Sequence, residues 1–503
     1  MIVIFFTEIS MIFSMPNKDT SGSGNAAVNR PQTITIIDST RNLDTTYIDN
    51  KADTLKQQID TMPDTLIADS SERIYYVSSI NGNDKYDGLA PRRALKTPAI
   101  ATKKVFESNQ DCTILFERGS LFRGNFGLLQ RNGKHYGYGA YGVGPKPVFC
   151  GSLLNYADSP WISQTSRSNV WLCNTEISND AGIVVFNEGQ NVGIKKFKLT
   201  ELQNNFDFYY DRSAKKVYLY YTSNPASSFD SIEIGQAWLE SPMTTDELSS
   251  ILSIPNSYKN INIENLSFQY GGGHGISGDN LSNIIIRGCE FNWIGGGVQN
   301  RDFSSDARYG NAVEFWNSCD NILVENCYFN QIFDAAITHQ GDKSSNINNN
   351  VTYRNNLMEY CNYSIEYFQR KPEALMSNIL VEGNIMRFAG YGWSSQRSDT
   401  GYAAHIQSWG HNNRTSNFII KNNILDTSLN NLFDIRINLS LTGTALPVLS
   451  DNIYSQTYGG LGGLWGSNLA NKSTIIKFTQ NDLETVDSNP LILLSKFVSE
   501  FRN

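Results

Sequence analysis

The chain is short of charge, of histidine and of long apolar runs, and each shortage excludes something. Charged residues make up 18% of the 503 residues, and the net charge is −8 with a pI near 5.3. This acidic balance argues against nucleic acid and anionic membranes as partners. Beyond the first sixteen residues no stretch is long and apolar enough to span a membrane. Nucleophile-elbow, P-loop and dinucleotide-binding signatures are missing as well, because the glycine triplets at 271–273 and 295–297 have no helix after them.

The sequence does contain a repeat, between residues 260 and 435. A short strand-like phrase opened by asparagine occurs six times, and its opening residues are Asn260, Asn283, Asn321, Asn350, Asn378 and Asn417. A second phrase accompanies each one and ends in Ile276, Val313, Ile337, Ile365, Ile406 and Phe433. Apolar runs at a period of a few tens of residues predict a solenoid. We expect an all-β, right-handed parallel β-helix.

The register of the repeat can be tested at the fourth residue after each asparagine. These positions alternate in sign: Glu264, Arg287, Glu325, Arg354, Glu382 and Lys421. Strands stacked about 4.8 Å apart would place each charge between two of opposite sign. The residues directly after the asparagines are predicted to stack inside the coil: Ile261, Ile284, Ile322, Val351, Ile379 and Phe418.

The seven cysteines show no metal-binding spacing. Cys289 and Cys327 each stand six residues after an opening asparagine, so we expect them to stack on adjacent coils. A small apolar core ladder is favoured over a disulfide, and the odd count leaves at least one free thiol.

Residues 1–72 are the segment in which a targeting signal and a linker are expected. Met1–Pro16 is apolar, interrupted by Glu8 and without Lys or Arg, so we expect at best a degenerate secretory signal. The Thr-, Asp- and Ser-rich segment to residue 72 predicts a flexible tether. A tether ahead of a compact β domain favours an exported, extracellular, cell-surface or periplasmic protein.

The folded part, from residue 73, opens with Ile74-Tyr-Tyr-Val-Ser-Ser-Ile-Asn-Gly-Asn-Asp-Lys-Tyr-Asp-Gly88. Ala94-Leu-Lys-Thr-Pro98 and Asp111-Cys-Thr-Ile-Leu-Phe-Glu-Arg-Gly-Ser-Leu-Phe-Arg-Gly124 follow. These stretches resemble the start of many pectin-lyase-fold, right-handed parallel β-helix proteins with PbH1-type repeats, over residues 74 to about 440. The resemblance implies that a strand and a helix near residues 99–108 cap the solenoid. It fixes no reaction, because the fold hosts lyases, hydrolases, epimerases and phage adhesins, and the motifs of pectate lyases and polygalacturonases are not apparent.

The sequence divides further into segments. Residues 73–154 are predicted to be the cap and first coils, 155–245 a β-rich insertion, 246–440 the β-helix core, and 441–503 irregular last coils with an apolar cap. The insertion's Phe206-Asp-Phe-Tyr-Tyr-Asp211 and Val217-Tyr-Leu-Tyr-Tyr-Thr222 stretches, followed by Asn224-Pro225, resemble an insertion found in several β-helix carbohydrate-active enzymes, where it would either cover the solenoid or contact the substrate. Outward apolar residues after the asparagines need a cover, which the insertion would supply. These residues are Ile285, Leu323, Leu380 and Ile419.

The chemistry is expected on the second phrase. The residues predicted to face outward there are Ser277, Glu314, Thr338, Glu366, Gln407 and Asp434. Two rungs separate Glu314 from Glu366, roughly 9–10 Å between backbones, and side chains can close this to the ~6.5–9.5 Å of an inverting glycosidase pair. Avoidance of stacked like charges would give the same spacing on an inert surface.

Two long excursions enter this strand and suit a substrate wall. They span residues 295–310 and 389–402, and long irregular insertions in a solenoid are often functional. Their aromatic residues could stack on sugars and their arginines could pair with carboxylate or sulfate groups. The candidate substrate-binding residues are Arg301, Tyr309, Trp393, Arg397, Tyr402 and Gln407.

Histidine is scarce, yet three of five, His274, His339 and His405, fall near the ends of second-phrase strands. His405 and His339 join Glu314, Glu366 and Asp434 as catalytic candidates, either as bases or as metal ligands. Asp334 and Asp342 could supply oxygen ligands for a bound Ca²⁺ ion, although their spacing matches no diagnostic calcium-binding motif.

The pattern as a whole predicts a monomeric carbohydrate-active enzyme that acts on a polysaccharide or oligosaccharide. A glycoside hydrolase that uses the carboxylate pair is the first expectation. The alternatives are a polysaccharide lyase that acts on a uronate-containing glycan by β-elimination, and a non-catalytic glycan-binding or adhesin protein.

Overall fold

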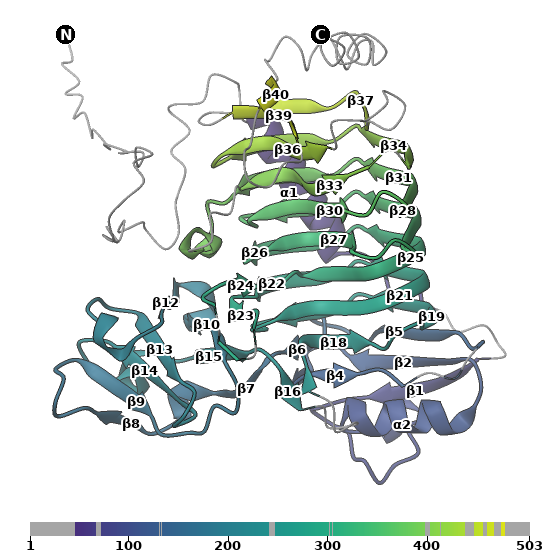
Figure 1. Ribbon diagram of the computed structural model, residues 1–503. Coiled ribbons are helices and arrows are strands. Elements are labelled where there is room, and N and C mark those ends of the chain that lie inside the picture. Colours follow the sequence, from purple (N-terminus) through teal and green to yellow (C-terminus); the bar gives the residue numbers. More distant parts are fainter. Residues whose placement is uncertain are drawn as a thin grey trace, which may run out of the picture. The chain divides into compact units, whose positions relative to one another are not determined.

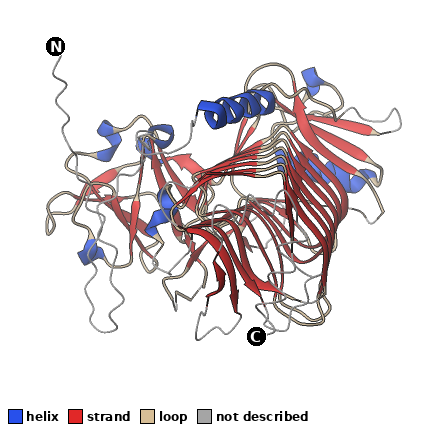
Figure 2. Ribbon diagram, turned by 90° about the horizontal axis from the view of Figure 1, so that it is seen from above, coloured by secondary structure: helices blue, strands red, loops and turns tan. Residues whose placement is uncertain are grey.

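The computed structural model describes residues 46–66, 72–129, 131, 133–240, 247–300, 302–303, 305–397, 403–412, 414–437, 447–455, 460–466 and 474–477. They belong to one compact unit, Gln32–Asn503. A right-handed parallel β-helix forms most of it, which confirms the predicted fold class. Figure 1 shows its coils stacked one above another, and Figure 2 looks down the stack. Among the described residues no helix is long and apolar enough to cross a membrane.

Each coil has three faces, one more than the two phrases of the repeat suggest. The carboxylate face carries the second phrase, in β4 (Phe126–Gly127), β18 (Ser250–Ile254), the first parts of β21 (His274–Arg287) and β25 (Val313–Glu325), β27 (Ala335–Gly341), β30 (Tyr363–Gln369), β33 (Ala404–His411), β36 (Asn431–Ile437) and β39 (Gly460–Gly466). The ladder face carries the asparagine phrase, in β1 (Arg73–Val77), β2 (Cys112–Glu117), β5 (Tyr136–Tyr141), β19 (Lys259–Glu264), the second parts of β21 and β25, β28 (Ile347–Arg354), β31 (Leu375–Glu382), β34 (Thr415–Lys421) and β37 (Val448–Ser450).

The third face is a separate nine-stranded sheet, which we call the helix-covered face. Its strands are β3 (Leu121–Arg123), β6 (Val148–Cys150), β20 (Ser267–Gln269), β22 (Glu290–Ile294), β26 (Tyr328–Ile332), β29 (Leu357–Glu359), β32 (Ile385–Ala389), β35 (Ile424–Ser428) and β38 (Ile453–Ser455). Stacked phenylalanines line its inner side, with Phe291 and Phe329 4.8 Å apart and nearly parallel.

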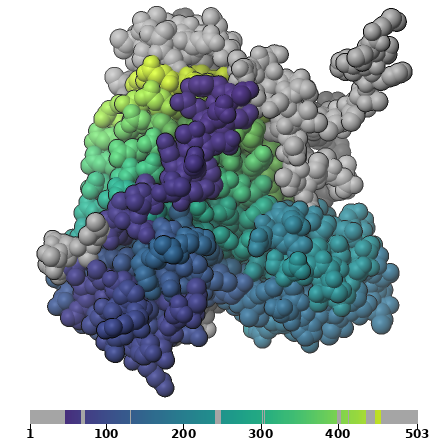
Figure 3. Space-filling model, turned by 180° about the vertical axis from the view of Figure 1, so that it is seen from behind, coloured from purple at the N-terminus to yellow at the C-terminus, as the bar shows by residue number. Residues whose placement is uncertain are grey.

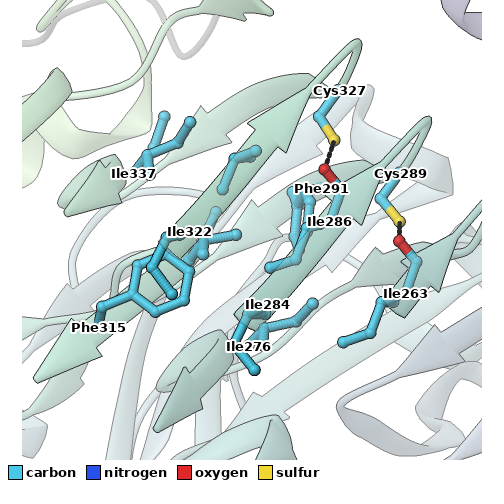
Figure 4. Close-up of a cluster of buried hydrophobic side chains, with 14 of the residues drawn as sticks. Ile263, Ile276, Ile284, Ile286, Cys289, Phe291, Phe315, Ile322, Cys327 and Ile337 are labelled. Atoms are coloured by element: carbon cyan, nitrogen blue, oxygen red, sulfur yellow. Dashed lines mark hydrogen bonds between the residues drawn. The ribbon is translucent and has the colours of Figure 1, made fainter. Parts of the chain in front are cut away.

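The predicted register is confirmed on the ladder face. Ile261, Ile284, Ile322, Val351, Ile379 and Phe418 are paired in sequence and buried. The six alternating charges stack in the same order, and Arg287 bonds to both Glu264 and Glu325. Cys289 and Cys327 lie on adjacent coils as free buried thiols (Figure 4). Each thiol donates to a backbone carbonyl, of Ile263 and Ile286 respectively, so the core-ladder interpretation holds.

Helix α1 (Thr46–Asp60) occupies part of the segment that the sequence predicted to be a flexible tether. That prediction is wrong for residues 46–66. The buried residues of α1 are Ile48, Ala52, Leu55 and Ile59, which share one side of the helix and pack on Leu357, Ile385 and Ile424. Figure 3 shows α1 running over several coils. Because the segment is polar overall, its four spaced apolar residues did not predict a helix. Met1–Pro16 lies outside the described residues.

The N-terminal cap forms as expected, with α2 (Pro98–Ser108) packed on β1 and β2. The Thr97 hydroxyl accepts from the Ile100 amide and so caps the first turn. At the other end, where irregular last coils were expected, a glycine-rich stretch forms β39, which pairs with β36, and β40 (Thr474–Lys477) runs antiparallel to β39. The predicted apolar cap at 489–494 lies outside the described residues.

The insertion forms two small sheets. One contains β7 (Ser152–Asn155), β10 (Ala181–Phe186), β11 (Asn191–Val192) and β15 (Ile232–Gln236), and the other contains β8 (Trp161–Ser163), β9 (Val170–Cys173), β12 (Ile194–Lys196), β13 (Asp207–Asp211) and β14 (Lys216–Tyr220). The short helix α3 (Pro225–Ser228) precedes β15. The insertion packs on the β-helix through Ile183, Val185 and Val192. These residues contact Trp293, Phe333 and Trp393.

The described part of the insertion packs there and does not cover the outward row that begins at Ile285, which corrects the prediction. Leu323, Leu380 and Ile419 continue this row and are half-buried on the ladder face. The glycine triplets at 271–273 and 295–297 allow the insertion to approach the β-helix closely. A Cβ on Gly182 would lie 2.6 Å from the Gly297 nitrogen and 2.7 Å from the Gly272 oxygen, so backbone meets backbone there.

Candidate active site

The outward row predicted on the carboxylate face is present. Ser277, Glu314, Thr338, Glu366, Gln407 and Asp434 are partners in consecutive strands. Glu314 and Glu366 therefore flank Thr338, with backbones roughly 9–10 Å apart at two strand spacings. These strands are the ones labelled β25, β27 and β30 in Figure 1.

Glu314 lies among polar groups at the half-buried edge of this row. Its Oε2 accepts a 2.6 Å hydrogen bond from Asn311 Nδ2 and lies 3.1 Å from His274 Nδ1. The backbone N–H of Asn311 also donates to His274 Nδ1 at 3.1 Å. The Tyr309 ring meets His274 edge-on at 5.0 Å, and Trp238 lies 6.1 Å beyond Tyr309. Asn311 thus holds Glu314 in place beside His274.

Glu366 has a different environment. It is buried, with 6% of its surface exposed. Its Oε1 accepts from the Trp409 indole and its Oε2 from the Gln340 amide. Burial raises the pKa of Glu366 to about 8, and the charges of Asp334 and, to a smaller extent, Glu314 act in the same direction. The Trp409 bond and Arg397 oppose the rise in pKa. At neutral pH this carboxyl holds its proton.

A β-bulge directs Trp409 to Glu366. Tyr367 pairs with Ser408 and Phe368 pairs with Gly410, so Trp409 is an extra residue in β33. Bulges re-aim side chains and are common beside active sites. The Trp409 indole lies against the Tyr363 ring, with centroids 6.1 Å apart.

The two excursions contact each other, because the Arg308 guanidinium of the first lies 5.6 Å from the centroid of the Trp393 ring of the second. The first contains the hairpin of β23 (Gly297–Val298) and β24 (Arg308–Tyr309), and the second contains the 3-10 turn η6 (Trp393–Gln396). Arg397 follows η6 and bonds to Asp334 at 2.7 Å. Its guanidinium also lies over the rings of Phe333 and Tyr363. This contact holds the second excursion against the carboxylate face.

Several predicted site residues are not where a substrate could touch them. Trp393 is 2% exposed, donates to the Gln331 carbonyl and packs on Phe333, so it anchors the loop. Gln407 and Asp434 are in the row but are 0% and 2% exposed, less than the 6% of Glu366. Arg301 and Tyr402 lie outside the described residues. Tyr309, at the edge of the row, and Arg397 remain candidates.

Two of the three histidines are in the interior. His339 bonds to the Tyr353 hydroxyl and stacks on Tyr367 within the core, and burial lowers its pKa to about 3. Alternation from the inward Ile337 places it there. His405 is buried too, with its pKa lowered to about 4. Its Nε2 donates to the Asp426 carbonyl, so its Nδ1 accepts from the Ser364 hydroxyl. Neither is placed to act as a base on this face, which corrects the prediction.

The aspartates considered for Ca²⁺ face arginines. Asp334 bonds to Arg397, and Asp342 lies 3.7 Å from Arg370. Within the part of the chain that the structure describes, no three His, Cys, Asp or Glu side chains are grouped so that they could hold a metal ion.

Sequence reasoning missed Asn311, Gln340 and Trp409, and it did not place His274. Gln340 had a usable signal, since it lies two residues after the outward Thr338. The β-bulge that positions Trp409 leaves no recognisable signal in the sequence.

The fold and the row together define a parallel β-helix protein with two differently buried carboxyl groups on one face. No family model matches the chain, and no curated protein does. Solved structures that it resembles include the GH136 lacto-N-biosidase from Eubacterium ramulus, at 14% identity and a TM-score of 0.44 over 78% of this chain. The chain spans 58% of that protein's length.

Two further similar structures are those of enzymes with other activities. The hyperthermoactive exopolygalacturonase from Thermotoga maritima matches at 10% identity and a TM-score of 0.37, covering 84% of this chain and 97% of its own. The alginate lyase from Paenibacillus sp. str. FPU-7 matches at 12% identity and a TM-score of 0.35, covering 73% of this chain and 97% of its own.

Proposed function

We propose that the protein is a glycoside hydrolase that acts on a polysaccharide or oligosaccharide, with Glu366 as general acid and Glu314 as general base. The observation that carries this is the contrast between two carboxyl groups on one row. The buried Glu366 is protonated at neutral pH, whereas Glu314 is partly exposed and lies beside His274. Paired carboxyl groups whose environments push their pKa values apart are the requirement for acid–base cleavage of a glycosidic bond.

The separation of the two groups favours inversion. In this reaction Glu366 donates its proton to the glycosidic oxygen as the C–O bond breaks. Glu314 takes a proton from a water molecule whose oxygen bonds to the anomeric carbon, so the product has the opposite anomeric configuration. Thr338 lies between them, and its buried hydroxyl has no hydrogen-bond partner among the described residues. A buried hydroxyl of this kind is a natural partner for an ordered water molecule.

Product analysis on a panel of neutral and acidic polysaccharides tests the proposal. A hydrolase yields new reducing ends without unsaturated products, and proton NMR of the first product reports the anomeric configuration. We expect the inverted anomer. Glu314→Gln and Glu366→Gln should each lose at least about a hundredfold in rate, a typical acid–base contribution. Glu382→Gln, on the ladder face, serves as the matched control and should keep the rate of the parent.

A polysaccharide lyase is the second candidate, because His274 and Tyr309 are in contact and could serve as base and acid in β-elimination. It would produce an unsaturated sugar that absorbs in the ultraviolet. A glycan-binding protein would give neither product, so the same panel separates all three functions.

A further inference from the structure

A second outward row runs beside the carboxylate row, two residues further along each strand. Asp279 pairs with Trp316, and Gln340 pairs with Phe368. Phe315 pairs with His339, so Trp316 and Gln340 occupy neighbouring rungs as well. Two residues along a strand correspond to about 6.6 Å. Trp316 therefore lies about one sugar ring from Glu314, on the same strand and the same face.

The indole of Trp316 packs on one buried ring while part of it stays exposed. Its ring meets Phe368 edge-on, at 5.9 Å and 78°. Phe368 is 5% exposed, and the Arg370 guanidinium lies 4.5 Å from its centroid. Trp316 itself is only half-buried. A fixed, partly exposed aromatic plane is the geometry on which the apolar face of a sugar ring stacks.

Gln340 connects this row to the reaction centre. It stands in the same row as Trp316, and its amide donates to Glu366 Oε2. A sugar ring over Trp316 would therefore lie next to the carboxyl group that protonates the glycosidic oxygen.

The charge of this face selects against acidic sugars. Besides Glu366, which holds its proton at neutral pH, its outward carboxyl groups among the described residues are Asp279, Glu314, Asp334 and the buried Asp434. Among the described residues near them, Arg397 faces the carboxylate of Asp334 and Arg370 faces that of Asp342. A uronate or sulfate placed here would meet an excess of negative charge, and two like charges 4 Å apart repel by about 1 kcal/mol even in bulk water.

We propose that Trp316 is the stacking platform of a sugar-binding subsite next to the carboxylate pair, and that this subsite takes an uncharged sugar ring. The inference rests on the proposed hydrolase function, because the bond to be cleaved lies over Glu314 and Glu366. It replaces the expectation, drawn from the arginines of the excursions, that the substrate carries carboxylate or sulfate groups.

Isothermal titration of the full chain with tetrasaccharides tests the subsite. The neutral probes are gluco-, xylo-, manno- and galacto-tetraose, and the acidic probes are tetragalacturonate and an alginate tetrasaccharide. At least one neutral probe should bind, and Trp316→Ala should weaken its affinity about tenfold, the equivalent of ~1.4 kcal/mol. Trp316→Phe should retain most of the affinity. Trp171→Phe, a half-buried tryptophan of the insertion, should bind like the parent.

The outcomes separate this proposal from the hydrolase assignment. Binding that depends on Trp316 without any cleavage supports the subsite and rejects the hydrolase. Cleavage of a neutral glycan that is indifferent to Trp316→Ala rejects the subsite and keeps the hydrolase. Binding of the acidic probes alone, or of none of the neutral ones, overturns the subsite. If Trp316→Ala does not fold, a ligand-induced change of indole emission that is present in the parent and reduced in Trp316→Phe provides the same readout.

Discussion

Asparagine shapes the corners of each coil. The opening residues of the six phrases have φ between +50° and +61°, a left-handed conformation that asparagine tolerates better than other side chains. Their amides also bond from rung to rung, as from Asn321 Nδ2 to Asn283 Oδ1 at 2.8 Å. A second, buried amide ladder joins Asn356, Asn384, Asn423 and Asn452. Cys289 and Cys327 occupy the equivalent positions on earlier coils. Local backbone chemistry thus makes the repeat visible in the sequence.

The same local rules made the carboxylate pair predictable and left its environment hidden. Alternation and register place Glu314 and Glu366 on one row, and both follow from the sequence. Their partners depend on the bulge at Trp409 and on loops that fold back over the row. The error on His339 had another cause. His339 lies near a strand end, but its alternation from the inward Ile337 turns its side chain into the core.

At the residue scale, the pH dependence of the rate should report Glu366. The general acid must be protonated, and the pKa of Glu366 is raised to about 8, mainly by burial. We expect kcat/KM to fall about tenfold per pH unit above pH 8. A pH series on the preferred substrate measures this. A rate that keeps rising through pH 9 would exclude Glu366 as the acid.

Glu366 should also make the parent less stable as the pH rises. A carboxyl whose folded pKa lies above its unfolded value binds more protons in the native state, so stability is full below about pH 4.5 and declines towards pH 8. Glu366→Gln removes this loss. Its melting temperature should match the parent near pH 4.5 and exceed it increasingly up to pH 8. Equal melting curves at both pH values would show that the carboxyl is not desolvated.

At the element scale, one buried ion pair fixes the insertion to the first excursion. Asp180 bonds to Lys195 at 2.6 Å and also accepts from the Val298 amide of β23 at 2.7 Å. Burial lowers the pKa of Lys195 to about 8, although Asp180 opposes that change. The pair therefore holds the hairpin that carries Tyr309.

Asp180→Leu should destabilise the fold and weaken substrate binding together. It leaves Lys195 buried without its carboxylate, which costs about 3–5 kcal/mol. The freed hairpin would raise KM more than it lowers kcat. Chemical denaturation and steady-state kinetics measure the two effects. Glu176→Gln removes the exposed pair with Lys215 and should change stability by less than about 1 kcal/mol. A stable Asp180→Leu variant with the KM of the parent would refute this role.

At the scale of the whole molecule, α1 is the element that the repeat could not reveal. A solenoid is nearly one-dimensional, because each coil contacts only its neighbours. Helix α1 instead lies across the strands of several coils, packing on Leu357, Ile385 and Ile424. Asp49 pairs with Arg387, and the Ile59 carbonyl accepts from Lys146 at 2.9 Å. One segment near the N-terminus therefore links coils that are far apart in the chain.

Truncating a buried side chain of α1 should reduce the stability of the protein and the steepness of its denaturant transition. Ile59 is fully buried, and Ile59→Ala should cost about 2–5 kcal/mol. Because α1 couples several coils, its loss should let them unfold in separate steps, so the denaturant transition should broaden. Thr54→Ala, on the exposed side of the helix, is the matched control and should unfold like the parent. A transition that moves to lower denaturant with unchanged steepness would mean that the helix stabilises the coils without coupling them.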